Sequence, residues 1–312
     1  MHGQEDLSRY AWLSIATGIV VFTLKMVAFT LTDSVGLLSD ALESTVNIVA
    51  AVVALVALKA AARPGNARMH YGLGKAEYFS AFFEGLMILI AAGLIMFTAV
   101  ERFLNPKPLE DLGVGVAISI AASVLNGTVA MILLRAGRRH RSIVLTADAK
   151  HLLTDVWTSV GVVLAVVLVG LTGWLRLDPI IAAAVALNIV LAGLKLMGSS
   201  AMGLLDAALP QEENDAIAEV LRKHQNEHLR FHAVQTRESG RQRFVAMHVL
   251  VPGDWSVAQG HDLLEVVEQE IRDALPGTVV STHLEPIEDP RSWTDQPPGG
   301  VAIPDEEIWS DN

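Results

Sequence analysis

The first two thirds of the chain consist of long apolar runs separated by short polar segments. A helix needs about 20 residues to cross a hydrocarbon core of roughly 30 Å, and six runs approach or exceed that length. They cover residues 12–31, 35–61, 79–103, 112–134, 143–171 and 179–197. The segments between them contain Pro, Gly, Asn and charged residues, which break helices. We therefore predict six transmembrane helices.

From Leu209-Pro210 onward the pattern becomes that of a soluble domain. Helical periodicity covers 214–226 and 257–275, and strand-like alternation covers 230–235, 243–251 and 278–285, with a turn at Gly240. The order predicts an α+β ferredoxin-like (α-β-β-α-β) domain with its helices on one face of a short sheet. The tail after Pro286 is rich in Pro, Gly and acids and is predicted to be disordered. The expected division is 1–208, 209–286 and 287–312.

Composition and charge support this division. The chain is 52% hydrophobic and only 18% charged, with a mean hydropathy of +0.42, which is unusual for a soluble enzyme. Residues 1–200 carry 15 basic and 13 acidic side chains, whereas residues 201–312 carry 8 and 21. The acidic balance argues against a nucleic-acid partner. The absence of cysteine excludes disulfide scaffolds, thiolate metal sites and cysteine nucleophiles.

Basic residues are distributed unevenly among the predicted loops. The loops after the second and fourth spans are rich in them (Lys59, Arg63, Arg68 and Lys75; Arg135, Arg138, Arg139 and Arg141), whereas the opposite loops carry Arg102, Lys107 and Arg176. The positive-inside rule then places both termini in the cytoplasm. The first run is too long for a cleavable signal peptide and lacks a cleavage site. With no eukaryotic targeting segment evident, we expect a bacterial inner membrane.

Ionisable residues inside the spans repeat one spacing. The second span contains Asp40-x-x-Glu43-x-x-x-Asn47, and the fifth contains Asp148-x-x-His151-x-x-x-Asp155. Residues four apart share a helix face. Each span can therefore offer two ligand atoms to one point between the helices.

Such a group of ligands suits a divalent transition metal ion. Oxygen and imidazole donors favour these ions, and the absence of thiolates disfavours copper(I). Because the ligands must lose protons to bind a cation, exchange of protons for metal is the expected mechanism. The alternative is interhelical hydrogen bonding without a ligand, but the repeated spacing favours a metal site.

Several motifs together resemble the cation diffusion facilitator family. They occupy residues 34–41, 71–77, 147–155, 178–180 and 204–210, and the similarity extends to about Pro286. The resemblance implies a six-span homodimer that exports divalent metals from the cytoplasm by proton antiport. It also implies a cytoplasmic metal-sensing domain of the predicted fold.

The resemblance also assigns the transport site. Its family positions are occupied by Glu43, Asn47, His151 and Asp155. Asn47 departs from the usual carboxylate and removes one negative charge, and Glu43 is longer than the common Asp. Zinc remains the leading metal because of His151, while oxygen-rich ligation would also accept iron(II), cobalt(II), manganese(II) or cadmium. Asp40 and Asp148 are candidates for supporting the ligands or relaying protons, with helix packing as the alternative.

In the cytoplasmic domain the resemblance implies a binuclear metal site at the dimer interface. The matching residues are His232, His248, His261, His283 and Glu285, and Lys75 and Asp206 match a charge interlock at the membrane boundary. Strand alternation places His283 and Glu285 on one face. The family's loop site near His70 is predicted to be absent, because Asn66 and Leu73 replace its acid and second histidine.

The remaining polar residues of the spans are given structural roles. Lys25 is expected to snorkel toward the interface, and Glu84, Asn126 and Asn188 are expected to pack between helices. The leading hypothesis is a metal exporter and not an enzyme. One alternative is a membrane-embedded metal sensor or scaffold that transports little because of Asn47. The other is an intramembrane hydrolase that uses His151, Asp155 and Glu43 around a metal, which ranks far below.

Overall fold

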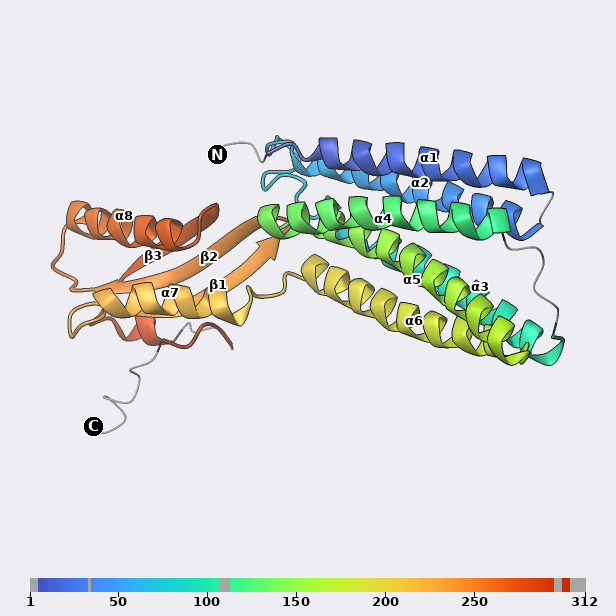
Figure 1. Cartoon of the computed structure of the whole chain (residues 1–312). Coiled ribbons are helices and arrows are strands. Elements are labelled where there is room, and N and C mark those ends of the chain that lie inside the picture. The colour runs from blue at the N-terminus through green and yellow to red at the C-terminus, as the bar shows by residue number, and fades with distance from the viewer. Residues whose placement is uncertain (1–4, 33–34, 107–112, 295–298, 304–312) are drawn as a thin grey trace. The chain divides into compact units, whose positions relative to one another are not determined.

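The computed structural model describes residues 5–32, 35–106, 113–294 and 299–303 of the 312-residue chain. The chain divides into two compact units, Met1–Leu204 and Leu205–Asn312. The first unit is a bundle of six long helices (Figure 1): α1 (Ser8–Thr32), α2 (Val35–Ala61), α3 (Ala76–Leu104), α4 (Gly113–His140), α5 (Ile143–Thr172) and α6 (Leu177–Leu204). Each of the six predicted apolar runs coincides with one of these helices.

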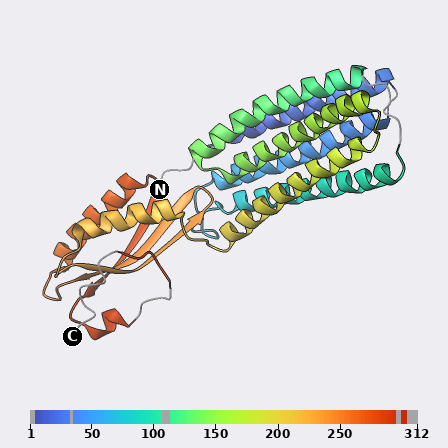
Figure 2. The same cartoon turned by 60° about the horizontal axis from the view of Figure 1, so that its bottom comes forward.

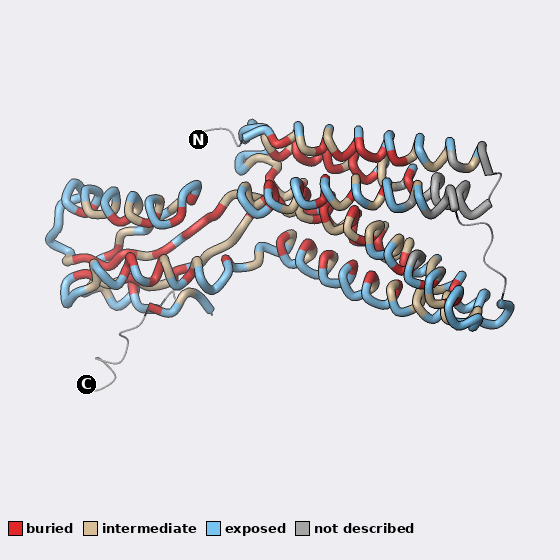
Figure 3. The backbone as a smooth tube through the Cα atoms, viewed as in Figure 1, coloured by how far each residue is buried: buried red, intermediate tan, exposed pale blue. Residues whose placement is uncertain are grey.

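The bundle has the surface of a membrane domain. Within the described residues, four stretches are long and apolar enough to cross a membrane: Ser8–Val27, Ala76–Leu104, Ile120–His140 and Leu177–Leu204. Large apolar side chains point outward along these helices, for example Phe97 and Leu104 of α3 and Val124 of α4. Figure 3 shows this exposed outer surface around a buried interior. In water such a surface would be unfavourable, whereas hydrocarbon solvates it.

Helix α5 lies against most of the bundle. It packs along α4 and also contacts α2, α3 and α6. Its start is fixed by Ser142, whose side chain accepts a hydrogen bond from the Leu145 amide (3.4 Å) and donates one to the buried Glu77 of α3 (2.6 Å). Its end is a left-handed residue, Gly173, with φ +69°. The helix is thereby held in a defined rotation, which determines where its polar side chains point.

Helices α3 and α6 approach closely at glycines. A Cβ atom on Gly85 would lie 2.7 Å from the Met197 side chain, and one on Gly193 would lie 2.9 Å from the Leu89 side chain. Small residues allow such close backbone contact between membrane helices. This contact keeps α3 in place beside α5 and α6.

The second unit contains α7 (Gln211–His224), β1 (Arg230–Ser239), β2 (Gln242–Val251), α8 (Val257–Ala274), β3 (Thr278–Pro286) and a short 3-10 helix η1 (Pro290–Trp293). Strand β2 is central, antiparallel to β1 and parallel to β3. Both α-helices lie on the same face of the sheet, as Figure 2 shows. The predicted order of helices and strands is confirmed.

The two faces of the sheet have different roles. Val245, Met247 and Val249 of β2 point toward the helices and form the core with Ile217 and Val267. Because side chains alternate along a strand, the residues between them point to the opposite face. That face carries the histidines described below.

The prediction of a disordered tail is wrong for its described part. The 3-10 helix is capped by Asp289, whose bond to the Arg291 guanidinium lowers the pKa of that carboxyl to about 2. The Trp293 indole donates to the Ile287 carbonyl (3.0 Å), and Ile303 is buried in the core. Residues 295–298 and 304–312 lie outside the described residues.

A β-bulge explains why the tail docks here. The register of β1 shifts between His232 and Gln235, with Ala233 at φ +51°. A bulge leaves a backbone group outside the ladder, and the Val234 carbonyl accepts a hydrogen bond from the Val301 amide (2.8 Å) instead. Gly300 permits this approach, because a Cβ atom there would lie 2.8 Å from the same carbonyl oxygen. Composition alone does not reveal such a backbone acceptor.

Replacing Arg243 with Met is expected to loosen the second unit, which contains the predicted cytoplasmic domain and is called the cytoplasmic unit below. Arg243 donates two hydrogen bonds of 2.9 Å to Glu213 and one of 2.8 Å to the Pro276 carbonyl, and it is only 9% exposed. Breaking a buried pair costs about 3 kcal/mol, which corresponds to roughly hundredfold faster amide exchange of β2. Hydrogen exchange of the full chain measures this. Lys223→Ala, which removes an exposed pair with Glu219, should change exchange less than about twofold; equal effects would contradict the prediction.

Candidate functional site

Polar side chains from α2 and α5 meet in the interior of the bundle. The Asn47 side chain contacts both partners: its Oδ1 lies 2.6 Å from His151 Nε2, and its Nδ2 donates to Asp155 Oδ2 (2.5 Å). His151 is buried, and Asn47 and Asp155 are partly buried. The structure therefore brings together three of the four residues predicted for the transport site.

The arrangement follows from helix geometry. His151 and Asp155 lie one turn apart on the same face of α5, and α5 contacts α2 at this level. A ring nitrogen of His151 and a carboxylate oxygen of Asp155 thus both contact the side-chain amide of Asn47 on the facing helix. The group contains one imidazole nitrogen and oxygen atoms of a carboxylate and an amide, which are donors for divalent transition metals.

Two predicted residues of α2, Asp40 and Glu43, have side chains that lie outside the described residues. Their roles stay predictions. Asp148 is described: it is buried, and its Oδ1 accepts a hydrogen bond from the Ser14 hydroxyl of α1 (2.9 Å). Asp148 therefore links α1 to α5 on the turn before His151, a position suited to supporting that ring.

Two residues that the sequence assigned to packing lie at this site. Asn126 of α4 donates to Asp155 Oδ2 (3.4 Å). Glu84 of α3 is buried, and its Oε1 lies 4.0 Å from His151 Nδ1. The signal that could have identified Glu84 was present, because an ionisable residue in a span indicates function by default. Glu84 lies on a third helix, α3, so its distance along the sequence from the motifs of α2 and α5 did not reveal this contact.

The cytoplasmic unit contains a second cluster. His232 of β1, His248 of β2 and His283 of β3 are register partners on three adjacent strands. Glu285 lies two residues after His283 on the same face, and it is buried. Its Oε2 lies 3.1 Å from His232 Nε2 and 3.4 Å from His248 Nδ1, and its Oε1 lies 3.4 Å from His283 Nε2.

This cluster has the composition of a metal site. His232, His248 and Glu285 form the one group of histidine and acidic side chains, among the described residues, whose ligand atoms all lie within 4.8 Å of one another. The His232 nitrogen that takes part is Nε2, which lies 3.1 Å from Glu285 Oε2. The Trp293 ring, 6.1 Å from the His232 ring, covers one side.

The remaining predicted ligand, His261, is placed differently. It lies on α8, is strongly exposed and pairs with Glu265 four residues later (4.0 Å). It is not part of the cluster formed by His232, His248 and Glu285. A ligand role for His261 would therefore require the second protomer that the family resemblance implies.

The two residues of the predicted charge interlock each have a contact in their own unit. Lys75 Nζ donates to the Leu204 carbonyl at the end of α6 (3.1 Å). Asp206 accepts a hydrogen bond from Arg237 of β1 (3.1 Å) and has a left-handed backbone (φ +59°). The interlock between them stays a prediction.

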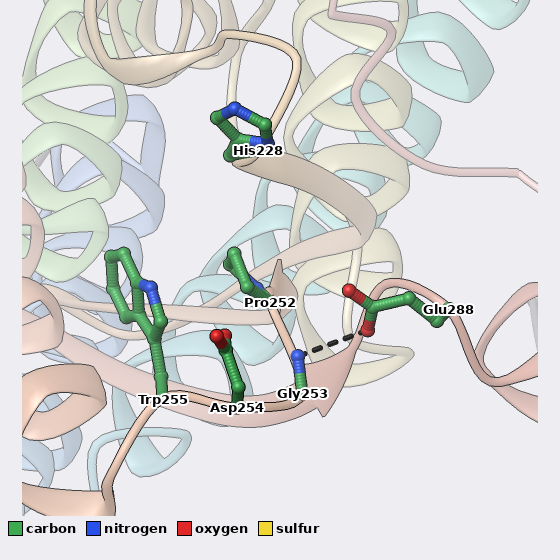
Figure 4. A pocket seen from close by; sticks show the side chains of 6 residues that line it. All are labelled: His228, Pro252, Gly253, Asp254, Trp255 and Glu288. Atoms are coloured by element: carbon green, nitrogen blue, oxygen red, sulfur yellow. Dashed lines mark hydrogen bonds between the residues drawn. The ribbon is translucent and has the colours of Figure 1, made fainter.

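A shallow pocket opens elsewhere on the cytoplasmic unit (Figure 4). Its lining includes His228, Asp254, Trp255 and Glu288, and Glu288 accepts a hydrogen bond from the Gly253 amide (2.9 Å). That bond fixes the Gly253 turn against the segment after β3. His228, Asp254 and Glu288 do not form a ligand group of the kind found around Glu285, as far as the described residues extend.

Comparison with known proteins identifies a family domain for each unit. The cation efflux transmembrane domain matches residues 11–205, which cover the bundle from Ala11 of α1 to the end of α6, and the cytoplasmic domain of cation efflux proteins matches residues 209–287. The uncharacterized transporter sll1263 of Synechocystis sp. is 50% identical over 91% of this chain and 92% of its own length. The cation-efflux pump FieF of Shewanella oneidensis is 30% identical over 88% and 92%.

A solved structure of CzrB in its zinc form is 32% identical over 26% of this chain and 91% of its own, with a TM-score of 0.23. Two family domains in sequence cover the bundle and the sheet, and the predicted ligand motifs lie within them. The chain belongs to the cation diffusion facilitator family of cation efflux transporters.

Proposed function

We propose that this chain is a homodimeric exporter of divalent transition metals that exchanges each ion for protons. The observation that carries the proposal is the contact of Asn47, His151 and Asp155 inside an apolar bundle. Polar side chains at such depth are costly unless they serve one another or a substrate. The name of the FieF relatives, cation-efflux pump, supports the same direction of transport.

The hydrogen bonds suggest how protons enter the exchange. Asn47 Nδ2 donates to Asp155, so its Oδ1 acts as an acceptor and His151 Nε2 carries a hydrogen toward it. A metal ion needs the lone pair of that nitrogen, so it competes with this proton. The exchange balances with an imidazolium as the metal-free ring: the ion displaces the hydrogen on Nε2 and leaves a neutral ring with its hydrogen on Nδ1. On release of the ion, Nε2 takes up one proton from solvent and the Asn47 amide again joins the two helices. Proton uptake and metal release are thus linked at one atom.

The donor set leaves more than one metal in range. His151 supports zinc, whereas the amide and carboxylate oxygens also suit iron(II), cobalt(II), manganese(II) and cadmium. Asn47 supplies a neutral oxygen where a carboxylate would supply a charge, and this lowers the attraction for any divalent ion. We propose zinc as the main substrate because of the imidazole. Because both family domains are those of cation efflux proteins, transport and not catalysis is proposed.

The cytoplasmic cluster is proposed as a regulatory metal site. A metal bound by His232, His248 and Glu285 would neutralise negative charge on an acidic domain and favour association with a second copy. His261 of α8 is proposed as a ligand contributed across that dimer. The loop charges predict that both termini lie in the cytoplasm. This domain would then sense the cytoplasmic metal concentration before the metal is exported across a bacterial inner membrane.

Replacing Asp155 with Ala is expected to abolish transport. The change removes the carboxylate that Asn47 and Asn126 contact. The ion would then lose the negatively charged ligand that the described part of the site provides. Zinc uptake into proteoliposomes with an imposed pH gradient measures the result, with iron(II), cobalt(II), manganese(II) and cadmium in parallel. Glu101→Ala, an exposed carboxylate near the end of α3, is the matched control. Uptake by Asp155→Ala at more than half the native rate would refute the assignment.

Replacing Asn47 with Asp is expected to raise the affinity for divalent ions by about tenfold, because a second charge then faces His151 beside Asp155. The concentration dependence of uptake for each metal gives the answer. A native chain that transports no metal, combined with an Asn47→Asp variant that does, would favour the sensor or scaffold function over the exporter.

Replacing His248 with Ala is expected to weaken cytoplasmic zinc binding by more than about tenfold. The full chain carrying Asp155→Ala is titrated with zinc against a chelator, so that the transport site does not contribute. His224→Ala is the control, because His224 pairs with Glu270 (3.1 Å) and is not part of the cluster. Unchanged affinity in the His248 variant would exclude the cluster as a metal site, and His261→Ala tests the contribution of the second protomer.

A further inference from the structure

Glu84 has an unusual environment. It lies on the buried stripe of α3 between Ala81 and Ile88, which face Ala147 of α5 and Ile189 of α6. It is 1% exposed, and neither carboxylate oxygen has a hydrogen-bond partner among the described residues. A buried carboxyl requires partners in either charge state, because its charge or its hydroxyl must be solvated. The side chain therefore needs an explanation other than packing.

A ring nitrogen of His151 lies close to this carboxylate. This atom, Nδ1, is buried, has no hydrogen-bond partner among the described residues and lies 4.0 Å from Glu84 Oε1. The other ring nitrogen, Nε2, faces Asn47 at 2.6 Å. An approach of about 1 Å would turn the Glu84 contact into a normal hydrogen bond. The ring thus stands between the amide of α2 and the carboxylate of α3.

Metal binding creates the need for this hydrogen bond. A ligating imidazole is neutral, so when Nε2 holds the ion its proton sits on Nδ1. Metal-bound histidines almost always donate that hydrogen to a carboxylate, carbonyl or water, which fixes the ring and makes it a better ligand. Glu84 Oε1, 4.0 Å from Nδ1, is placed to accept it.

Charge supports the same role. Asn47 carries no charge. Among the described residues, the one carboxylate that contacts it is Asp155. Asp148 and Asp155 lie close enough to Glu84 for their negative charges to repel its carboxylate. When carboxylates repel one another in a buried site, a divalent cation between them stabilises their charged forms. Glu84 restores the charge that Asn47 removes.

We propose that Glu84 is a positioning residue of the transport site, which orients His151 through Nδ1 and supplies the negative charge that Asn47 lacks. This inference rests on the proposed metal transport. It assigns a function to α3 in addition to α2 and α5. It also explains why a chain with an amide among its ligands retains a usable site.

The test uses four full-length variants in proteoliposomes with zinc as the substrate. Glu84→Gln keeps the shape and a hydrogen-bond acceptor but removes the charge, and it should raise the KM for zinc by about 10–100-fold. Asn47→Asp in the Glu84→Gln background should lower the KM by at least about thirtyfold, a larger factor than the about tenfold expected in the native background, because there it returns the only carboxylate, among the described residues, that supports the ring. Asn47→Asp alone provides the fourth corner of the cycle, and Glu101→Gln, an exposed carboxylate of the same helix, should leave the KM within about twofold.

A purely structural Glu84 would behave differently. Its replacement would lower the amount of folded protein, measured by size-exclusion chromatography, and Asn47→Asp would change the KM by the same factor in both backgrounds. That additivity, or a Glu84→Gln KM within about threefold of native, would overturn the proposal. If Glu84→Gln does not fold, Glu84→Asp decides: its charge is withdrawn from Nδ1 by one methylene, and an unchanged KM would refute the role.

Failure of the proposed transport is recognised separately. Zinc affinity of the same variants is measured in detergent by competition with a chelator, in the His248→Ala background that weakens the cytoplasmic cluster. A native chain that moves no zinc, but whose zinc affinity falls in the Glu84→Gln variant, would contradict export and retain the role of Glu84 in the site. Loss of the Glu84 effect in both measurements would overturn the inference alone.

Discussion

The bundle depends on how it solvates a few polar groups in an apolar interior. The Asn47 amide bridges His151 and Asp155, and Asn126 reaches the same carboxylate. As glue these contacts are weak, because hydrogen bonds between membrane helices contribute about 0.6 kcal/mol on average. Placing ionisable groups at such depth costs at least about 2.5 kcal/mol each on insertion scales. Stability alone therefore does not account for them, whereas the proposed binding of a cation would.

The cytoplasmic sheet also brings candidate ligands together, but through strand geometry and not through helix packing. There the ligands come from the alternation of strands: the helix-facing side chains of β2 form the core, and the alternate ones leave His248 between His232 and His283. The bulge at Ala233 changes this alternation after His232, so that Val234 joins the core and its carbonyl receives the tail. The same irregularity thus places the tail, with Trp293, beside the cluster.

Sequence periodicity predicted what depends on local geometry. The limits of α2 and the order of the sheet followed from apolar runs and alternation, and the pairing of His151 with Asp155 followed from the four-residue spacing. Three features depend on contacts between distant segments and were missed or wrong: the tail held by Val234 and Val301, Asn126 beside Asp155, and Glu84 beside His151. No single-helix pattern contains the packing of α3 against α5.

The loss of a ligand charge at Asn47 can be understood through the same packing. A transport site must bind an ion firmly enough to select it and weakly enough to release it. In the proposed site, a neutral amide in contact with His151 and Asp155 would lower the attraction for the ion and offer both side chains a partner when the ion leaves. A carboxylate behind the ring, as at Glu84, keeps some of that attraction without adding a further direct ligand. The strength of binding is then set by residues of three helices, so a movement of α3 relative to α5 would change the affinity of the site.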